Sequence, residues 1–514
     1  MNELILLPIV VPILLGFVLL FLPEKVFGSR KMLVNMTCVS FLLCALLGCF
    51  VISGAAGEQL FLFWLVRSMP VYFAIDNLGR LFAGVVTLVF VLVGFFSLSY
   101  MQNEENEKRY YAFYLITYGV LMGLDFAGNL MTLYLFYELM TLVSAPLVFH
   151  HGTKEAVMAG LKYLLYSFGG AYMALFGIFY LSPFSIVLAD SLPSFPASGF
   201  HVKLAALNFV PGGSLDMELV ELMGNNTMLL VAVFLMILGF SVKAGMFPLH
   251  AWLPTAHPVA PAPASAFLSG VIVKGGVFAI IRTVFYCVGA DVLRGTWVQT
   301  VWAVLAIVTL VMGSALAFKE KSLKKRLAYS TVSNLSYILL GISMLNTTAF
   351  VGSLLHVVFH AVIKSALFLF AGALIFNTGR TKVNDFIGLA GRMPILYWCY
   401  TVVSLGLVGI PPTSGLVSKW YLAIGCLESQ MGAVGWIGAA ALLVSALLTA
   451  GYLLPISIKG FLYAPVDSSL ITKYHEPAPF MLVPIMIFAA LTIMFGICPV
   501  PFIDFISGIA AAII

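Results

Sequence analysis

The stretch Gly239–Arg282, GFSVKAGMFPLHAWLPTAHPVAPAPASAFLSGVIVKGGVFAIIR, decides the fold. Two apolar runs, which hold Lys243 and Lys274, are separated by a break at Pro248 and a proline-rich loop. A lysine at the centre of a membrane-spanning helix costs roughly 2.5–3.5 kcal/mol on insertion scales, so such residues usually line a bundle interior or a water-filled path. The stretch therefore predicts membrane helices that surround a path for ions.

The composition of the whole chain is that of a polytopic membrane protein. Of 514 residues, 62% are hydrophobic and 9% are charged, more apolar surface than a water-soluble core absorbs. The net charge of +5 comes mostly from basic residues in short loops, which membrane topology explains better than nucleic-acid binding. The seven cysteines form no CxxC pair, which argues against an iron–sulfur cluster, a zinc site or a disulfide scaffold. The first apolar run follows Glu3 without a basic segment or cleavage site, so we expect a retained helix.

Apolar runs of about 20 residues, the length that crosses a bilayer, predict an all-α fold with about fourteen transmembrane helices. These helices are expected near 4–22, 32–53, 79–100, 110–126, 129–149, 160–182, 228–250, 264–288, 298–318, 327–345, 353–376, 397–425, 434–459 and 480–506. They divide into three N-terminal helices (1–109), a first repeat of helices 4–8 (110–288), a second repeat of helices 9–13 (289–459) and a last helix (460–514). Because each repeat has five spans, the second is expected to run inverted relative to the first.

The distribution of Lys and Arg predicts the orientation. The odd-numbered loops are rich in these residues, whereas the even-numbered loops hold only Arg67, Lys203 and Arg294. Basic loops stay in the cytoplasm, so both termini are expected on the non-cytoplasmic side of the cell membrane. Two long connections on that side, 54–77 and 182–227, carry no recognisable chemical motif and are expected to cap the bundle.

Seven basic residues remain within or at the edges of the predicted spans. Arg80 and Arg282 lie near helix ends and are expected to extend their charged groups to the membrane interface. The other five are Lys162, Lys243, Lys274, Lys364 and Lys419. A purely structural role for all of them is improbable because of the summed insertion cost, although any single one can be structural.

Glu138 is the one acidic residue of the apolar run NLMTLYLFYELMTLVSAPLVF. It is either half of a structural ion pair or a gate whose charge depends on a neighbouring lysine. Desolvation favours a neutral amine and a nearby carboxylate favours the charged form. Opening or closing a contact between Glu138 and Lys243 would therefore switch this lysine between holding and releasing a proton.

His356, His360 and Lys364 are spaced at i, i+4 and i+8, which places them on one helix face. Histidines that titrate near neutral pH in a line are suited to passing protons. A zinc pair and ordinary core histidines are the alternatives, and a third metal ligand is not found nearby in the sequence.

The seventh and twelfth predicted helices are both interrupted. The first break lies at Gly245 and Pro248, and the second at Pro411–Pro412. Broken helices at matched positions in two halves indicate an ion site in a transporter. The match is imperfect, because Lys243 precedes its break whereas Lys419 follows its own.

These motifs resemble the antiporter-like membrane subunits shared by respiratory complex I, Mrp-type multi-subunit Na⁺/H⁺ antiporters and membrane-bound energy-converting hydrogenases. The resemblance runs from about Phe73 to about Leu422 and is carried by LYLFYELM, VKAGMFPLHAWLPTAHPVAPAPASAFLSGVIVK, LKKRLAYSTVSNLSYILLGI, HVVFHAVIKSALFLFAGAL and GIPPTSGLVSK. It implies fourteen helices with inverted five-helix repeats. The path that it implies contains Glu138 paired with Lys243, then Lys162, Lys274, His356, His360 and Lys419.

The resemblance also implies a subunit without a redox cofactor of its own, driven by a partner module. Expected partners are other membrane subunits, including paralogous antiporter-like ones, and a hydrophilic redox module. His250 completes the candidate proton-translocation residues. Thr255 stands where many relatives have an acid, which weakens any ion role for that position.

Four classes of function follow. The first is a subunit that translocates protons, or exchanges Na⁺ for protons, in such a complex. The second is a structural membrane scaffold, and the third is a stand-alone secondary transporter. An independent enzyme is disfavoured because the sequence has no nucleophile motif, metal box or nucleotide loop, although the whole complex would be an oxidoreductase or an antiporter.

Overall fold

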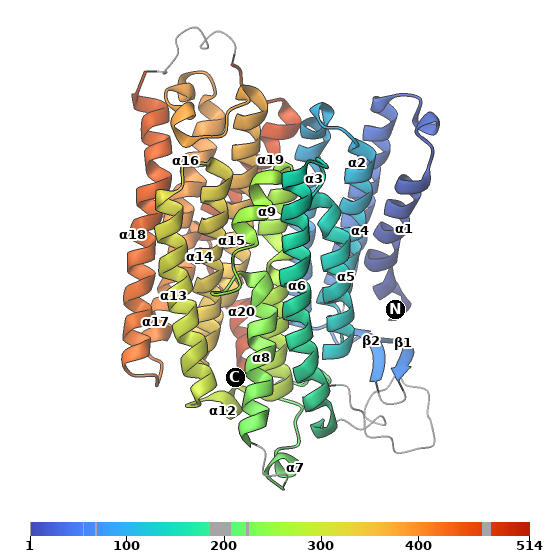
Figure 1. The fold of residues 1–514 in the computed structure, drawn as a ribbon, viewed down its shortest axis with the longest axis vertical. Coiled ribbons are helices and arrows are strands. Elements are labelled where there is room, and N and C mark those ends of the chain that lie inside the picture. The colour runs from blue at the N-terminus through green and yellow to red at the C-terminus, as the bar shows by residue number, and fades with distance from the viewer. Residues whose placement is uncertain (1, 55, 67–68, 186–206, 223–225, 465–473) are drawn as a thin grey trace.

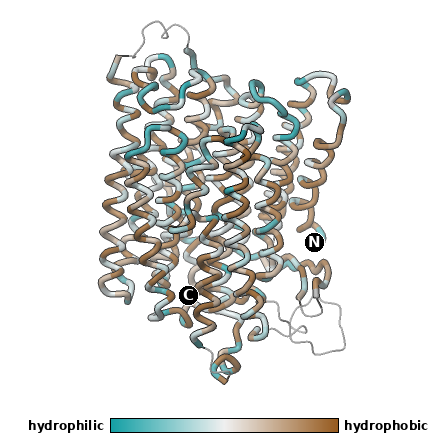
Figure 2. Tube along the Cα trace, in the orientation of Figure 1, coloured by the Kyte–Doolittle hydropathy of each residue, from teal (hydrophilic) through white to brown (hydrophobic). Residues whose placement is uncertain are grey.

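The structure is a computed structural model, and it describes residues 2–54, 56–66, 69–185, 207–222, 226–464 and 474–514. The described part is a bundle of long helices that run roughly along one axis (Figure 1). Eleven of its helices are long and apolar enough to cross a membrane, or twelve if a bent pair counts as one span. Hydrophobic residues dominate the helices, and hydrophilic ones gather in the connections at the upper end (Figure 2). The predicted polytopic membrane protein is confirmed.

The helices of the first part of the chain are α1 (Leu7–Phe21), α2 (Arg30–Ser53), α3 (Asn77–Tyr100), α4 (Glu107–Asp125), α5 (Leu130–Val148), α6 (Lys154–Leu181), α7 (Met217–Leu222), α8 (Asn226–Ala244), α9 (Leu253–Val259), α10 (Ala262–Phe267) and α11 (Lys274–Ile281). Those of the second part are α12 (Ala290–Leu293), α13 (Trp297–Lys319), α14 (Leu323–Ser343), α15 (Thr347–Thr378), α16 (Pro394–Val408), α17 (Ser414–Leu427), α18 (Ala433–Leu462), α19 (Pro479–Ile497) and α20 (Val500–Ala511).

A β-hairpin interrupts the expected all-α fold. Its antiparallel strands β1 (Gln59–Val66) and β2 (Met69–Ala74) occupy the first of the two long connections that were expected to cap the bundle. The run QLFLFWLV is too short to span a bilayer and is rich in aromatic residues, which favours a strand. The prediction of an all-α chain is therefore wrong in this segment.

Part of the topology prediction lies outside the described residues. This holds for Arg67 and Lys203, and for 186–206, most of the long connection that was expected to cap the bundle.

Both predicted interruptions are present. The helix α8 ends before Gly245, which has φ +71°, and α16 ends before Gly409, which has φ +92°. Only glycine adopts this left-handed region without steric cost, so it commonly ends helices. Each break also contains a cis peptide bond before proline, at Phe247–Pro248 and Pro411–Pro412.

The segment Ala262–Val288 crosses the centre of the bundle and is completely buried. It is not a regular helix, because π-helical turns occupy Leu268–Ile272 and Arg282–Val288. Such turns are rare and frequently mark functional sites. Lys274 directly follows the first of them. The neighbouring α15 is almost completely buried as well, and these two elements pack together at the core of the bundle.

Candidate ion-translocation site

Lys243 lies in the last turn of α8 and is completely buried. Its Nζ donates a hydrogen bond of 2.5 Å to the hydroxyl of Tyr163 on α6. The ammonium group lies 4.1 Å from the ring centroid of Tyr163, 5.8 Å from that of Tyr137 and 6.0 Å from that of Trp252. The Tyr163 hydroxyl shares a second hydrogen bond, of 2.8 Å, with Ser144. An aromatic cage thus holds this lysine, since ring faces attract a cation.

Glu138 on α5 acts on Lys243 at a distance. Its Oε1 is buried and has no hydrogen-bond partner within the described structure. The direct pair that the resemblance implies is not formed here, because Lys243 contacts Tyr163 instead, although the two charges act on each other through space. The free carboxylate oxygen is available to accept a proton.

Lys274 begins α11 and is 2% exposed. Its Nζ donates a hydrogen bond of 2.7 Å to the carbonyl of Ser269, within the preceding π-helical turn. The charge of Lys274 acts electrostatically on His356, His360 and Lys364. Lys274 is therefore within electrostatic range of the histidines of α15.

The two histidines of α15 lie on one face, as their spacing predicts. The rings of His356 and His360 stack with centroids 5.7 Å apart. Nδ1 of His356 hydrogen-bonds with Ser418 Oγ at 3.0 Å, while its Nε2 and both ring nitrogens of His360 have no partner in the described part of the chain. One turn further, Lys364 donates a hydrogen bond of 3.1 Å to the Leu327 carbonyl. Among the described residues, no three His, Cys, Asp or Glu side chains are grouped to hold a metal ion.

Lys419 on α17 reaches back to the broken end of α16. Its Nζ donates hydrogen bonds of 2.6 Å and 2.9 Å to the carbonyls of Leu407 and Val408. The ammonium group lies 5.1 Å from the ring centroid of Tyr337, and that ring stacks on His356 with centroids 5.3 Å apart. Tyr337 therefore joins Lys419 to the histidine pair.

Lys162 and His250 lie apart from this row. Lys162 donates a hydrogen bond of 3.0 Å to the hydroxyl of Thr255, and its charge acts on His250, which is half-buried. Thr255 is thus a hydrogen-bond partner of this lysine. Tyr163, the next residue after Lys162, is the one that contacts Lys243.

Two further buried basic residues are missing from the predicted site. His257 is completely buried in α9, both of its ring nitrogens lack a partner in the described structure, and its ring stacks on Phe368 with centroids 4.7 Å apart. Lys324 donates a hydrogen bond of 2.7 Å to the carbonyl of Ala260. His257 lies in the stretch that decides the fold, so its position was a signal. Lys324 stands in a run of charged residues, Lys319–Arg326, that the sequence alone predicts to be solvated, and only the packing of α14 reveals its burial.

The expectation that Arg282 extends to the interface is wrong. Its side chain is 1% exposed, and Nη1 forms an ion pair of 2.5 Å with Asp76. The guanidinium also lies 4.7 Å from the ring centroid of Phe209 and 4.5 Å from that of Tyr286. Asp76, which neutralises Arg282, lies 206 positions away in the chain, so the sequence around Arg282 does not predict this ion pair.

A membrane bundle with two broken helices and a buried row of lysines and histidines defines the class of ion-translocating membrane proteins. Residues 127–449 match the family described as NADH:quinone oxidoreductase/Mrp antiporter, TM. Residues 66–111 match NADH-Ubiquinone oxidoreductase (complex I), chain 5 N-terminus. The chain belongs to this family of antiporter-like membrane subunits, which confirms the expectation from its motifs.

Individual relatives include subunits of a quinone oxidoreductase and of a Na(+)/H(+) antiporter. The chain is 33% identical over 372 residues to NADH-quinone oxidoreductase subunit N of Desulforudis audaxviator, covering 70% of this chain and 68% of that protein. It is 28% identical over 525 residues to a Na(+)/H(+) antiporter subunit of Alkalihalophilus pseudofirmus, covering 100% and 98%. Its fold matches a chain of the membrane-bound sulfane sulfur reductase, an archaeal respiratory membrane complex, with a TM-score of 0.81 at 21% identity over 99% and 97% of the two chains.

Proposed function

We propose that the chain moves protons across the cell membrane as an antiporter-like subunit of a larger complex. The proposed row consists of Glu138, Lys243, Lys274, His356, His360, Lys364 and Lys419, with Lys162 and His250 beside it. One observation carries the proposal: among the described residues, the ammonium groups of the four lysines in the row donate hydrogen bonds only to hydroxyl and carbonyl oxygens and form no ion pair. Burying an ion without a paired counter-charge costs several kcal/mol, which a scaffold has no reason to sustain at Lys243, Lys274 and Lys364.

The first step of the proposed mechanism is at Lys243. An ionised Glu138 favours the charged form of this lysine, and protonation of Glu138 favours release of the lysine's proton. The helices α8 and α11 are packed tightly here, since a Cβ on Gly276 would lie 2.8 Å from the Cβ of Lys243. In this mechanism the released proton goes to Lys274, two residues before Gly276 on α11, and on to the two histidines of α15.

The second half completes the path. His356 receives the proton beside Tyr337 and Ser418, and Lys419 passes it to the opposite side of the membrane. Lys364 acts on the same histidines from the next turn of α15. We assign no metal and no redox cofactor to this row.

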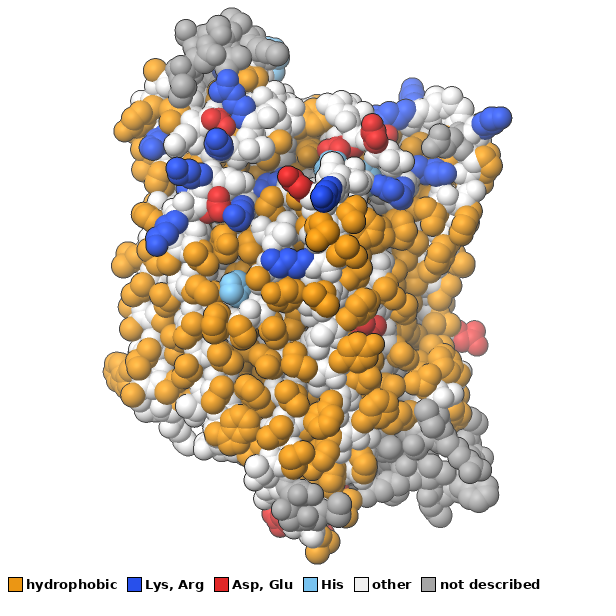
Figure 3. All heavy atoms as spheres, in the orientation of Figure 1, with side chains coloured by type: hydrophobic (Ala, Val, Ile, Leu, Met, Phe, Trp, Pro, Cys, Tyr) orange, Lys and Arg blue, Asp and Glu red, His pale blue; other side chains and the backbone are white. Residues whose placement is uncertain are grey.

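The proposed architecture has fourteen spans in the groups 1–109, 110–288, 289–459 and 460–514, with the two middle groups as inverted repeats. The buried helices α4 and α14, together with the broken pair α16–α17, bring the eleven apolar spans to fourteen. The matched breaks after α8 and α16 support the repeats. Lys and Arg side chains gather at the upper end of the bundle (Figure 3), and both termini lie nearer the other end (Figure 1), which supports non-cytoplasmic termini.

The proposed partners are other membrane subunits, including paralogous ones, and a hydrophilic redox module. The exposed apolar face of α6, with Leu165 and Tyr172 at 72% and 70% exposure, offers a surface for a neighbouring subunit or lipid. Exchange of Na⁺ for protons is the second candidate, because the Na(+)/H(+) antiporter relative aligns over the whole chain.

The test is Lys243→Met in the assembled complex. We expect proton translocation into membrane vesicles to fall at least about tenfold, while native gels show normal assembly. Lys154→Met is the matched control, because Lys154 is exposed at the start of α6, and it should translocate normally. Normal translocation by Lys243→Met contradicts the proposal, and loss of assembly in place of an assembled but inactive complex favours the scaffold.

A further inference from the structure

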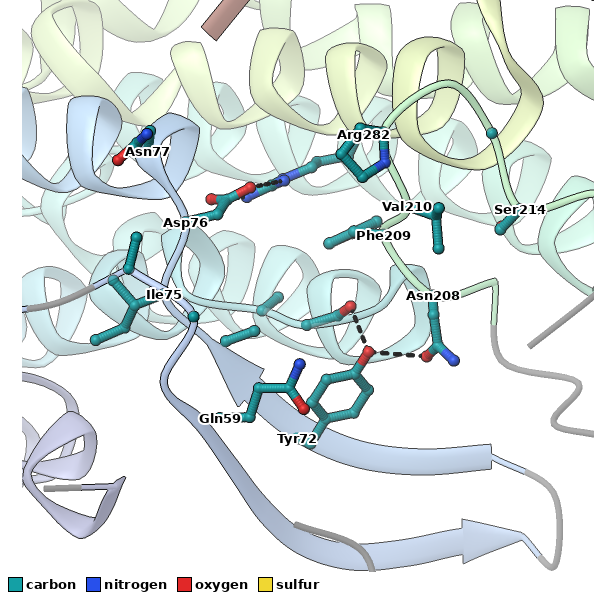
Figure 4. Close-up of a pocket in the computed structure, with 17 residues that line it drawn as sticks. Gln59, Tyr72, Ile75, Asp76, Asn77, Asn208, Phe209, Val210, Ser214 and Arg282 are labelled. Carbon is teal, nitrogen blue, oxygen red and sulfur yellow. Dashed lines mark hydrogen bonds and ion pairs between the residues drawn. The ribbon is translucent and has the colours of Figure 1, made fainter. Parts of the chain in front are cut away.

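A cavity of about 750 Å³ lies outside the lysine row, at the end of the bundle that holds the hairpin. Its walls come from the end of β2, the connection between α4 and α5, and residues 207–214 (Figure 4). Cavities of this size typically bind a small organic molecule. None of the residues in the proposed row lines this space.

The wall of the cavity is mostly apolar. It includes Ala74 and Ile75 at the end of β2, Ala127 after α4, and Phe209 and Val210. A water molecule in an apolar space finds too few hydrogen-bond partners, whereas an apolar molecule is taken up readily. The larger part of an occupant is therefore expected to be apolar.

Four buried polar atoms of the lining residues lack a partner among the described residues. They are Oε1 of Gln59, Nδ2 of Asn208, Oγ of Ser214 and Nε of Arg282. Asn208, Ser214 and Arg282 are each only 1–2% exposed. An unsatisfied buried polar group costs about 1–3 kcal/mol. An occupant that matches the cavity therefore carries hydrogen-bonding groups as well as an apolar body.

The charge of Arg282 is already neutralised within the cavity wall. Its two terminal nitrogens donate to the two carboxylate oxygens of Asp76, at 2.5 Å and 2.6 Å. The guanidinium also lies 4.7 Å and 4.9 Å from the ring centroids of Phe209 and Phe278. A carboxylate or phosphate ligand prefers the two-pronged contact that Asp76 has taken. The single remaining donor, Nε, suits the carbonyl oxygen of an uncharged group.

The cavity lies where helices that span the bundle end. Asp76 caps the start of α3, Ala127 follows the end of α4, and both line the cavity. Spanning helices end where the hydrocarbon core of a bilayer gives way to its interfacial region, the depth at which lipid ester groups lie. Val210, another lining residue, is 38% exposed, so the cavity wall reaches the protein surface.

We propose that the cavity binds the glycerol-ester region of a diacyl lipid with no net charge, of the phosphatidylethanolamine type. The ester carbonyls accept hydrogen bonds from Nε of Arg282 and Nδ2 of Asn208, and the lipid ammonium group donates to Oε1 of Gln59. The adjoining part of an acyl chain covers the apolar wall. This lipid site is independent of the proposed proton translocation.

The first experiment tests the site and its charge preference. The protein, purified with its accompanying subunits, is placed in phosphatidylglycerol vesicles that carry a trace of either phosphatidylethanolamine or phosphatidylglycerol with a diazirine next to the ester. Cross-linked peptides are then mapped by mass spectrometry. We expect the phosphatidylethanolamine probe to label residues 207–214 at least about fivefold more than the phosphatidylglycerol probe.

The exposed face of α18, with Leu443 and Leu447 at 66% and 74% exposure, is the internal control, and both probes should label it equally. Equal labelling of residues 207–214 by the two probes, or preference for phosphatidylglycerol, overturns the proposal.

The second experiment removes the donors. Asn208→Leu replaces the amide with an apolar group of similar size, so labelling of 207–214 by the phosphatidylethanolamine probe should fall at least about fivefold. Asn226→Leu, at an exposed position at the start of α8, is the matched control and should label normally.

Ser214→Ala provides a second test that adds no volume, which matters if Asn208→Leu does not fold. It removes the unpartnered hydroxyl, and labelling of 207–214 should fall about twofold. Unchanged labelling in both Asn208→Leu and Ser214→Ala, or in Ser214→Ala alone where Asn208→Leu does not fold, overturns the proposal.

Discussion

The two broken helices hold their lysines in different ways. In the first half, Lys243 precedes the break, sits in an aromatic cage and feels the charge of Glu138. In the second half, Lys419 follows the break and binds the last carbonyls of α16, the negative end of that helix. Both lysines lie next to the same structural feature, a helix that ends at a glycine in the middle of the bundle.

Because of this difference, the charge of Lys243 can be switched, whereas Lys419 occupies a fixed site. A carboxylate can gain or lose a proton, so the environment of Lys243 can change its charge within one cycle. Backbone carbonyls keep a constant dipole, so the environment of Lys419 stays the same unless α16 and α17 move. We therefore propose that the first half controls the proton and that the second half receives it.

The largest effect that separates the halves is expected from Glu138→Gln. Without the carboxylate, Lys243 loses the charge that switches it, and translocation by the assembled complex should fall at least about tenfold, the equivalent of one unit of proton affinity. Glu155→Gln, at an exposed position in the first turn of α6, is the control and should be neutral. Equal translocation by Glu138→Gln and Glu155→Gln would show that the first half contains no carboxylate switch.

A smaller loss is expected from Lys419→Met. The carbonyls of Leu407 and Val408 lose their charged donor, which costs stability of about 2 kcal/mol and lowers the thermal unfolding temperature. Translocation should fall by roughly three- to tenfold, because a water can replace part of the site. Lys419→Arg should restore most of the stability. A complete loss of translocation with normal stability would show that Lys419, too, is a switch.

Tyr163→Phe tests the aromatic cage itself. The ring remains, but the hydroxyl that accepts the hydrogen bond from Lys243 is lost, at about 1 kcal/mol, so flux should fall roughly two- to fivefold. Tyr172→Phe on the same helix is 70% exposed and serves as the matched control. An unchanged rate in Tyr163→Phe would mean that the ring faces alone hold the lysine.

The smallest effect is expected from His250→Gln. His250 is half-buried beside Lys162 and contacts neither the Tyr163 cage nor the histidines of α15 in the described structure. Translocation, followed by a pH-sensitive dye in vesicles, should stay within about twofold of wild type. A loss as large as that of Glu138→Gln would place His250 in the row.

The sequence predicted those parts of the site that depend on residues close together in the chain. A lysine within an apolar run is costly to bury, so Lys243 and Lys274 could be recognised as functional candidates. Gly and Pro interrupt helices, so both breaks could be predicted as well. The spacing of His356 and His360 likewise fixed their common face.

The remaining features depend on contacts between distant segments. Asp76 neutralises Arg282 across 206 positions, and a hydroxyl on a different helix takes the place of the Glu138 carboxylate at Lys243. The π-helical turns around Lys274 have no composition that distinguishes them from an α-helix. Only the packed bundle decides these contacts.

Lys274 offers the most direct test, because from α11 its charge acts on both histidines of α15. The measurement is proton translocation by the assembled complex that carries Lys274→Met, with Lys319→Met at the exposed end of α13 as its control. A continuous row predicts a loss of at least about tenfold with normal assembly. Normal translocation in the Lys274→Met complex would contradict a proton path through the middle of this protein.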